Sequence, residues 1–296
     1  MPLSAMLHSA ATTLDATITL VAHVFHEHYT PELRSKVERS LPKERATIRW
    51  YAAPTERVAQ YPALSYVTRP SYYYFLAPDA LGPEIQQVIY LDCDVIVRRS
   101  LAHLAAMPMN GKAVLGVPDP WAPFAESPYG IGMWRELGIP PGTSNYNSGV
   151  LLLDLQRWRE LGLQDRVFAF LDTHADRILM QDQEAINAVL WREFGRLDAR
   201  WNQVPEFFDA DAPGLVEYDA LQLEAICTDP WCVHYAVPSK PWHGGNRHPW
   251  RSLFFEHLNG TQWAGWKPPR MDLWRYRLRP RLGQVKRRLR KALVRT

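Results

Sequence analysis

The sequence predicts an α/β fold in which helices flank a mixed sheet. Over about the first two hundred residues, apolar extended runs alternate with helix-like stretches, which is the pattern of βαβ units. One run, Val88–Leu91, is short and wholly apolar, as expected of a central strand buried on both faces. From Trp201 onwards the chain is dense in Pro, Trp and Asp, and we expect mainly loops there. A chain of 296 residues can hold one large domain of this class with an appendage.

Local patterns place the other elements. Pro31 suits the first turn of a helix, and Gly82 and Pro83 end another. Asp182 is a candidate N-cap for a helix that begins directly after it. The patterns predict strands over 18–25, 47–51, 112–117 and 149–153, and helices over 31–40, 72–81, 161–173 and 183–192.

Composition excludes several classes of protein. Hydrophobic content of 47% with 22% charged residues is typical of a soluble globular protein. No apolar run approaches the roughly 20 residues that a membrane span requires. The first residues lack a basic start followed by an apolar core, so we expect no secretory signal. The three cysteines are few and odd in number, which suits a reducing cytosol.

The strongest chemical signal is the pair Asp92 and Asp94, which follows the apolar run directly. In an extended backbone these side chains leave on one face, and Cys93 leaves on the other. Open α/β sheets bind ligands beyond the carboxyl ends of their strands. Two adjacent carboxylates repel each other, and a divalent cation such as Mn²⁺ or Mg²⁺ resolves that conflict. Taken alone, Asp-x-Asp is also common as an ordinary polar turn or loop after a strand.

Further motifs follow in a fixed order along the chain. They are Asn145-Tyr-Asn-Ser-Gly-Val-Leu-Leu-Leu-Asp-Leu155 with Trp158, Asp182-Gln-Glu-Ala-Ile-Asn187, and His234-Tyr followed by Lys240-Pro-Trp242. Together with Tyr90-Leu-Asp-Cys-Asp94, they make the chain resemble glycosyltransferase family 8, especially its bacterial lipopolysaccharide α-galactosyl- and α-glucosyltransferases. The resemblance implies a Rossmann-like GT-A glycosyltransferase fold over nearly the whole chain.

The same resemblance implies that Asp92, Asp94 and His234 hold Mn²⁺ against the diphosphate of a UDP-sugar. The metal and Lys240 would then stabilise negative charge on the leaving phosphate. His234 could otherwise be a core or loop histidine, and Lys240 an ordinary solvated lysine. Cys227 and Cys232 near the histidine do not form a zinc motif, because a second cysteine pair is missing.

Other positions match the family's sugar pocket. The resemblance places Asn147 and Gly149 at the donor sugar, although Tyr-Asn-Ser-Gly also suits a turn before a strand. It places Asp182 on sugar hydroxyls and Gln183 near the reactive face of the anomeric carbon. An amide is a poor nucleophile, so we favour front-face attack by the acceptor, with Gln183 steadying the transition state. Asp119 matches a position near the acceptor, and an exposed loop aspartate is the alternative.

Three departures from the family pattern bear on activity. Relatives begin with a strand that contacts uridine, whereas Met1–Ser9 already resembles the helix after it. We therefore expect the first strand and its nucleotide contacts to be missing at the N-terminus, as a misassigned start would explain. Tyr74 stands where relatives often carry an arginine, for which Arg69 could compensate. Val237 stands where relatives often have glycine after the metal histidine.

The C-terminal segment differs from the rest in charge. Residues 270–296 contain eleven Lys or Arg and one acid, while the remainder of the chain is mildly acidic. Leu282, Val285, Leu289 and Leu293 recur at helical spacing among these bases. Such a helix suits an anionic membrane surface. A solvated tail is one alternative, and nucleic-acid binding is another that we do not expect, because no matching basic groove accompanies the tail.

The sequence therefore predicts a GT-A catalytic domain over 1–265 and a basic, aromatic and amphipathic membrane-docking tail over 266–296. We expect a cytoplasmic retaining hexosyltransferase, peripheral at the inner face of the membrane. It would move galactose or glucose from a UDP-sugar to a lipopolysaccharide- or lipooligosaccharide-type acceptor with Mn²⁺. The alternatives are a catalytically impaired binding protein of the same fold and a basic membrane- or nucleic-acid-binding protein. The sequence does not specify the hexose, the acceptor or the oligomeric state.

Overall fold

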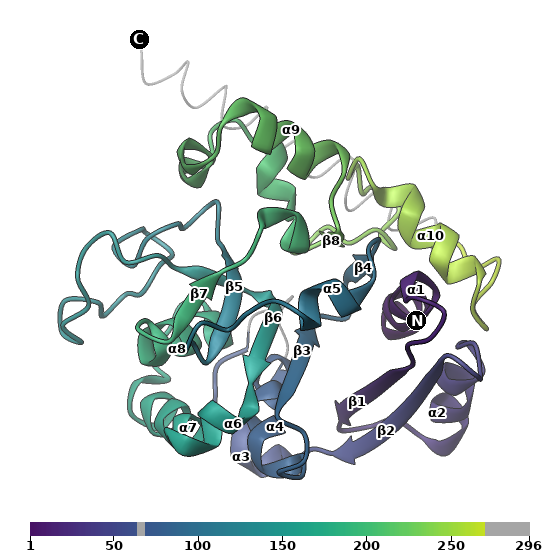
Figure 1. Cartoon of the computed structure of the whole chain (residues 1–296), viewed down its shortest axis with the longest axis horizontal. Helices are drawn as coiled ribbons and strands as arrows, with labels where there is room; N and C mark the ends of the chain where they lie inside the picture. Colours follow the sequence, from purple (N-terminus) through teal and green to yellow (C-terminus); the bar gives the residue numbers. More distant parts are fainter. Residues whose placement is uncertain (64–68, 270–296) are drawn as a thin grey trace.

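A four-stranded sheet lies at the centre of the protein, whose computed structural model describes residues 1–63 and 69–269 (Figure 1). Its strand order is β3–β6–β5–β7. The strand β6 (Tyr146–Asp154) pairs antiparallel with β3 (Gln87–Leu91) and with β5 (Val114–Pro118). The short β7 (Phe194–Arg196) pairs parallel with β5 at the outer edge.

Two smaller sheets flank this centre. One consists of β1 (Leu20–His26) and β2 (Ala46–Ala52), paired in parallel through the crossover helix α2 (Pro31–Glu38). The other consists of β4 (Val95–Val97) and β8 (Cys232–His234), paired antiparallel. In Figure 1 the β1–β2 sheet stands apart from β3, at the lower right.

Helices surround the sheets. The N-terminal α1 packs against α10 and β4, and Figure 1 shows α9 and α10 along the upper side of the molecule. The α-helices are α1 (Pro2–Thr13), α3 (Thr55–Val58), α4 (Ala77–Ala80), α5 (Leu101–Ala105), α6 (Leu155–Glu160), α7 (Leu163–His174), α8 (Gln181–Leu190), α9 (Ala220–Thr228) and α10 (Arg251–Asn259). The 3₁₀ helices are η1 (Arg69–Leu76), η2 (Ala199–Asn202), η3 (Pro205–Phe208) and η4 (Pro213–Glu217).

The central strand β6 is buried on both faces, because its side chains alternate between two hydrophobic clusters. Leu151 and Leu153 belong to the cluster that contains Trp158. Val150 and Leu152 belong to the cluster that contains residues of α1. This double burial makes β6 the rigid support for the polar residues at its amino-terminal end.

Most of the predicted elements are present with shifted ends, and four local predictions are wrong. The 72–81 segment is the 3₁₀ helix η1 followed by one turn of α4, because Pro78 has no backbone N–H and cannot continue an α-helix that begins before it. The helix predicted over 161–173 is present as α7, which Gly162, at φ +57°, separates from the preceding α6. Asp182 lies inside the first turn of α8, whose N-cap position is Met180.

The third wrong prediction concerns the segment after Trp201, which contains α9 and α10 as well as loops. The α9 helix begins with a capping box formed by Asp219 and Gln222, a signal that was present in the sequence. The fourth wrong prediction is the burial of β3 on both faces. Its residues are exposed or half-buried, because β3 forms the edge of the four-stranded sheet.

The expected N-terminal helix is confirmed as α1, and in the described part of the chain no strand precedes it. The predicted amphipathic helix at 270–296 lies outside the described residues. In the part that is described, none of the helices has the length and apolar character needed to cross a membrane.

Candidate functional site

Asp92 and Asp94 lie in the turn that joins β3 to β4. The sequence predicted an extended backbone here, whereas the Val95 N–H donates to the Asp92 carbonyl at 3.2 Å and closes a turn. The turn still brings the two carboxylates to one side. The Asp92 N–H also donates to the Gly149 carbonyl at 2.9 Å, which ties the turn to β6.

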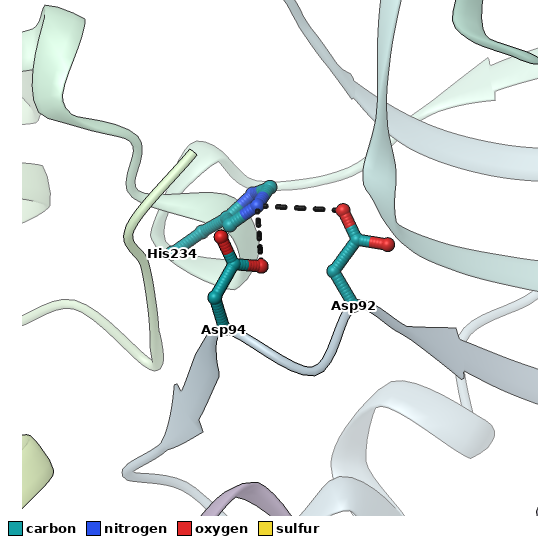
Figure 2. Close-up of side chains that lie close together, drawn as sticks. All are labelled: Asp92, Asp94 and His234. Atoms are coloured by element: carbon teal, nitrogen blue, oxygen red, sulfur yellow. Dashed lines mark ion pairs between the residues drawn. The ribbon is translucent and has the colours of Figure 1, made fainter. Parts of the chain in front are cut away.

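His234 reaches the same point from far along the chain. The antiparallel pairing of β4 with β8 sets Val95 opposite His234 and so places the imidazole beside the turn. Its Nε2 lies 3.5 Å from Asp92 Oδ2 and 3.4 Å from Asp94 Oδ1 (Figure 2). One ligand atom from each of the three residues lies within 4.8 Å of the others. The sequence prediction that these residues share one place is confirmed.

Asp92, Asp94 and His234 together form a corner of the site, and the geometry of the imidazole tests whether this corner suits a cation. Nδ1 lies 2.9 Å from the amide oxygen of Asn202, which can only accept, so Nδ1 carries the proton. In the neutral ring Nε2 therefore directs a lone pair at two carboxylates. Three electron-rich groups facing one another require a positive charge between them, and a divalent ion supplies it. The donor set of two carboxylates and one imidazole fits Mn²⁺ or Mg²⁺.

The charges of these three residues shift one another's pKa values. Burial raises the pKa of Asp92, and the charge of Asp94 raises it further against the pull of His234. Burial would also raise the pKa of Asp94, but the charges of His234 and Lys240 outweigh it and hold that pKa well below its usual range. Burial would lower the pKa of His234, and Asp94 reverses this effect. The raised pKa values of Asp92 and His234 both favour bound protons, which offset the negative charge of the corner.

Lys240 adds a fixed positive charge at the corner. Its ammonium group donates to Asp94 Oδ2 and, at 2.8 Å, to the carbonyl of Tyr235. Both Lys240 and Asp94 are largely buried, so their attraction is weakly screened by solvent. The solvated-lysine alternative is wrong.

Gly149 has a steric role that the sequence did not reveal. A Cβ at this position would lie 2.1 Å from His234 Cε1 and 3.0 Å from Asp92 Oδ2. The imidazole therefore occupies the space that a side chain would need. The Tyr-Asn-Ser-Gly stretch is not a turn, because Tyr146–Gly149 already belongs to β6.

A chain of hydrogen bonds links the corner to the residues expected at the sugars. Asn202 donates to Asn147 Oδ1 at 2.8 Å, and Asn147 donates to Gln183 Oε1 at 3.2 Å. Gln183 in turn donates to Asp119 Oδ2 at 3.0 Å. Asn202 is a residue that sequence reasoning missed, since nothing in its local pattern marks it.

Two tyrosines missed as site residues line the other side. The Tyr90 hydroxyl donates to Asp92 Oδ1 at 2.6 Å, and its ring packs against that of Tyr74 with centroids 4.4 Å apart and an angle of 35° between the planes. Asp182 is buried nearby. Burial and the charge of Asp92 raise the pKa of Asp182 to about 7, although the hydroxyls of Ser71 and Ser148 oppose that rise.

The predicted site residues all line one cavity of about 1430 Å³. They come from the β3–β4 turn, β6, α8, β8 and the loops that follow β5 and β8. They are Asp92, Asp94, Asp119, Asn147, Gly149, Asp182, Gln183, His234 and Lys240.

A mixed sheet that carries an Asp-x-Asp turn and a downstream histidine beside a cavity defines a glycosyltransferase of the GT-A class. The glycosyl transferase family 8 model matches residues 1–245, and the chain belongs to this family. The family resemblance and the GT-A fold expected from the sequence are therefore confirmed.

Proteins and structures that resemble the chain agree with this assignment. The chain is 25% identical over 265 residues to general stress protein A of Bacillus subtilis, covering 88% of this chain and 90% of that protein. It is 24% identical over 253 residues to lipopolysaccharide 1,3-galactosyltransferase of Salmonella typhimurium, covering 83% and 70%. The crystal structure of the galactosyltransferase LgtC with donor and acceptor sugar analogs superposes with a TM-score of 0.75. It has 22% identity and covers 93% of this chain and 94% of that one.

Proposed function

We propose that the protein is a metal-dependent retaining hexosyltransferase. It takes galactose or glucose from a UDP-sugar and passes it to a hydroxyl of a lipopolysaccharide- or lipooligosaccharide-type saccharide. The convergence of Asp92, Asp94 and His234 in the cavity that also contains Gln183 and Asp182 is the observation that carries this proposal. The similarity to a lipopolysaccharide galactosyltransferase supports the class of acceptor.

The ion would be Mn²⁺ or Mg²⁺, held by Asp92, Asp94 and His234. When bound, it supplies positive charge that stabilises the diphosphate leaving group. Lys240 lies on the same carboxylate and adds a permanent charge to that environment. Asn202 holds the imidazole proton on Nδ1, so the other nitrogen stays available as a ligand.

The chain's own hydrogen bonds favour front-face attack. Gln183 Oε1 already accepts from Asn147 at 3.2 Å and from the Ser148 N–H at 3.3 Å, and this engagement makes a weak nucleophile weaker. In the proposed step the acceptor oxygen bonds to the anomeric carbon while the bond from that carbon to the phosphate oxygen breaks. The acceptor proton passes to the departing diphosphate. Gln183 and Asp182 orient the donor, and Asp119 orients the acceptor.

The test is hydrolysis and transfer with defined donors. UDP-galactose and UDP-glucose are incubated with the full chain, with Mn²⁺ or EDTA, and the anomer released first is identified by NMR. The α-anomer, formed only with the ion, is expected from an α-linked donor. Release of the β-anomer would contradict retention, and equal rates in EDTA would contradict metal dependence.

A second candidate is a binding protein of the same fold that has lost turnover. Tyr74 favours this candidate, because a tyrosine cannot supply the positive charge of the arginine that relatives often carry at that position. This candidate predicts that UDP-sugars with Mn²⁺ raise the melting temperature while no UDP is released. Release of UDP above the EDTA background would eliminate it.

The location of the enzyme is part of the proposal. We expect it in the cytoplasm, held at the inner face of the membrane by the basic tail over 270–296, where a lipid-linked acceptor would be presented.

A further inference from the structure

Glu206 is an acidic residue of the cavity that the proposed reaction does not use. It lies in η3, shortly after Asn202, whose amide oxygen holds the imidazole of His234. Val204 and Phe207 are both buried, and residues three apart share a face of a 3₁₀ helix. Glu206 falls on a different face of η3, where its half-buried side chain lines the cavity.

The η3 helix is held firmly by its buried face and by the segment before it. The carbonyl of Phe207 accepts from Cys227 Sγ at 3.4 Å, and the Phe207 ring meets Tyr218 edge to face with centroids 5.6 Å apart. The backbone N–H of His234 donates to the carbonyl of Gln203 at 2.9 Å. These contacts fix η3 relative to β8, and a side chain on a fixed element can position a ligand precisely.

The Glu206 carboxylate has room for a hydrogen-bond donor. No other residue in the described part of the chain donates a hydrogen bond to it or forms an ion pair with it. Burial raises the pKa of Glu206, its own backbone N–H lowers it, and the charge of Asp119 raises it again. The charge of His234 acts on it as well, so Glu206 lies between the acceptor side and the corner. A carboxylate in this position gains from a donor that enters the cavity.

Asp119, by contrast, is already occupied by the protein. Its Oδ1 accepts from the N–H groups of Trp121 at 2.9 Å and Ala122 at 3.1 Å. Its Oδ2 accepts from Asn147 at 3.3 Å and Gln183 at 3.0 Å. A carboxylate offers about four lone-pair positions, so a sugar hydroxyl can bind Asp119 only by displacing one of these donors.

The charge around Glu206 has no counter-charge nearby. The lysine and arginine side chains among the described residues that line the cavity are Arg49 and Lys240. Lys240 is bound to Asp94, and Arg49 belongs to β2, outside the four-stranded sheet. A hydroxyl brought to Glu206 would find an acceptor, whereas an acidic group would meet a like charge.

We propose that Glu206 binds the acceptor and determines which charge it can carry. Its carboxylate accepts a hydrogen bond from a hydroxyl of a neutral acceptor sugar, and its negative charge excludes acidic acceptors. The inference rests on the proposed function, because it assumes a donor sugar beside Gln183 and Asp182. It adds the charge of the accepted sugar to that function.

The test measures donor hydrolysis and sugar transfer by the full chain with Mn²⁺ and with UDP-galactose or UDP-glucose. The acceptor probes are methyl galactoside, methyl glucoside and the corresponding methyl uronides, which carry a carboxylate at C6. Glu206→Ala is expected to lower the ratio of transfer to hydrolysis at least about tenfold through a higher acceptor KM, because a hydrogen bond to a charged group is lost.

Glu206→Gln separates a specific role from a damaged fold. It keeps the shape and an acceptor oxygen but removes the charge, so we expect use of the uronide relative to the hexoside to rise about tenfold or more. A misfolded variant cannot gain this activity. Asp211→Asn, which removes an exposed acid from the loop after η3, is the matched control and should change neither ratio.

Several results would overturn the proposal. An unchanged preference between hexoside and uronide in Glu206→Gln is one, and a preference of the unaltered enzyme for the uronide is another. A fall in hydrolysis as large as the fall in transfer in Glu206→Ala would indicate a donor-side or structural role. Release of UDP without transfer to either neutral hexoside would also count against it. Failure of the proposed function differs from all of these, because the unaltered enzyme would then release no UDP at all.

Discussion

The two edges of β3 have opposite characters. Along one edge all five residues pair with β6, and the strand ends in the corner formed by Asp92, Asp94 and His234. Along the other edge β3 has no strand partner among the described residues, and its residues line the cavity. The paired edge belongs to a polar site whose parts hold one another by short hydrogen bonds. The unpaired edge is held by side-chain packing without a second set of backbone hydrogen bonds. The residues of the site therefore depend on one edge of β3 and not on both.

Loss of the imidazole tests the corner most severely. We expect His234→Ala to reduce transfer by about a thousandfold or more, because removal of a single preorganised group already costs about 10²–10³. The stabilisation of the protein by Mn²⁺, measured as a shift in melting temperature, is expected to disappear as well. His103→Ala in α5, an exposed histidine, is the matched control and should change neither quantity. Retained Mn²⁺ stabilisation in His234→Ala would remove the histidine from the ligand set.

Gly149→Ala tests the corner without altering a ligand. The new Cβ would overlap the imidazole of His234, so the ring must move away from the carboxylates. We expect a loss of transfer of about a hundredfold, comparable to the cost of disturbing groups that orient a metal ligand. Weaker binding of Mn²⁺ in a titration should accompany the loss. Unchanged Mn²⁺ affinity would contradict the steric role of this glycine.

A pair of identical substitutions compares the two edges directly. Val150 of β6 is fully buried opposite Leu91, whereas Val21 of β1 is 45% exposed. We expect Val150→Ala to lower the free energy of unfolding by about 2 kcal/mol and Val21→Ala by less than about 1 kcal/mol. Urea denaturation measures both. Equal losses would contradict the difference in burial between the two valines.

Gln183→Ala tests the route of attack. If the acceptor attacks from the front face, the substitution removes an orienting group, and transfer is expected to stay within about tenfold to a hundredfold of the original rate. The measurement is the transfer rate at saturating donor, together with donor affinity. Complete loss of transfer with donor affinity intact would favour a covalent intermediate on Gln183.

Deletion of residues 270–296 should have the smallest effect on the corner. Transfer to a soluble acceptor is expected to be nearly unchanged, while binding to vesicles that contain anionic lipid should be lost, because the eleven bases of this segment are removed. Sedimentation with vesicles measures the second quantity, with neutral vesicles as the control. Unchanged binding to anionic vesicles would refute the docking role.

Residues adjacent in sequence were the easier part of the site to predict. Asp92 and Asp94 stand two positions apart after an apolar run, so their proximity follows from local geometry, even though a turn rather than an extended backbone produces it. Gln183 and Asp182 were found from the family resemblance. Asn202 and the hydrogen-bond chain through Asn147 could not be found, because their partners are 32 and 55 residues away from Asn202 along the chain.

Errors in the predicted elements have the same origin. The aromatic run Tyr72–Phe75 is helical as predicted, yet it forms a 3₁₀ helix whose residues are all buried, so no amphipathic pattern marked its type. The strand β3 looked fully buried from its apolar residues, yet its exposure depends on what lies beside it. An apolar sequence shows that a strand can be buried, and the elements that pack beside the strand determine whether it is buried.

By itself the sequence determined the α/β class, the order of the chemical motifs and the carboxylate pair, because each depends on contacts within a few residues. Only the tertiary structure decided that β4–β8 pairing carries His234 to that pair, that Gly149 leaves room for its ring, and that residues of β1 and β3 line the same cavity. These features join segments far apart in the chain, and no local pattern records the distance between them.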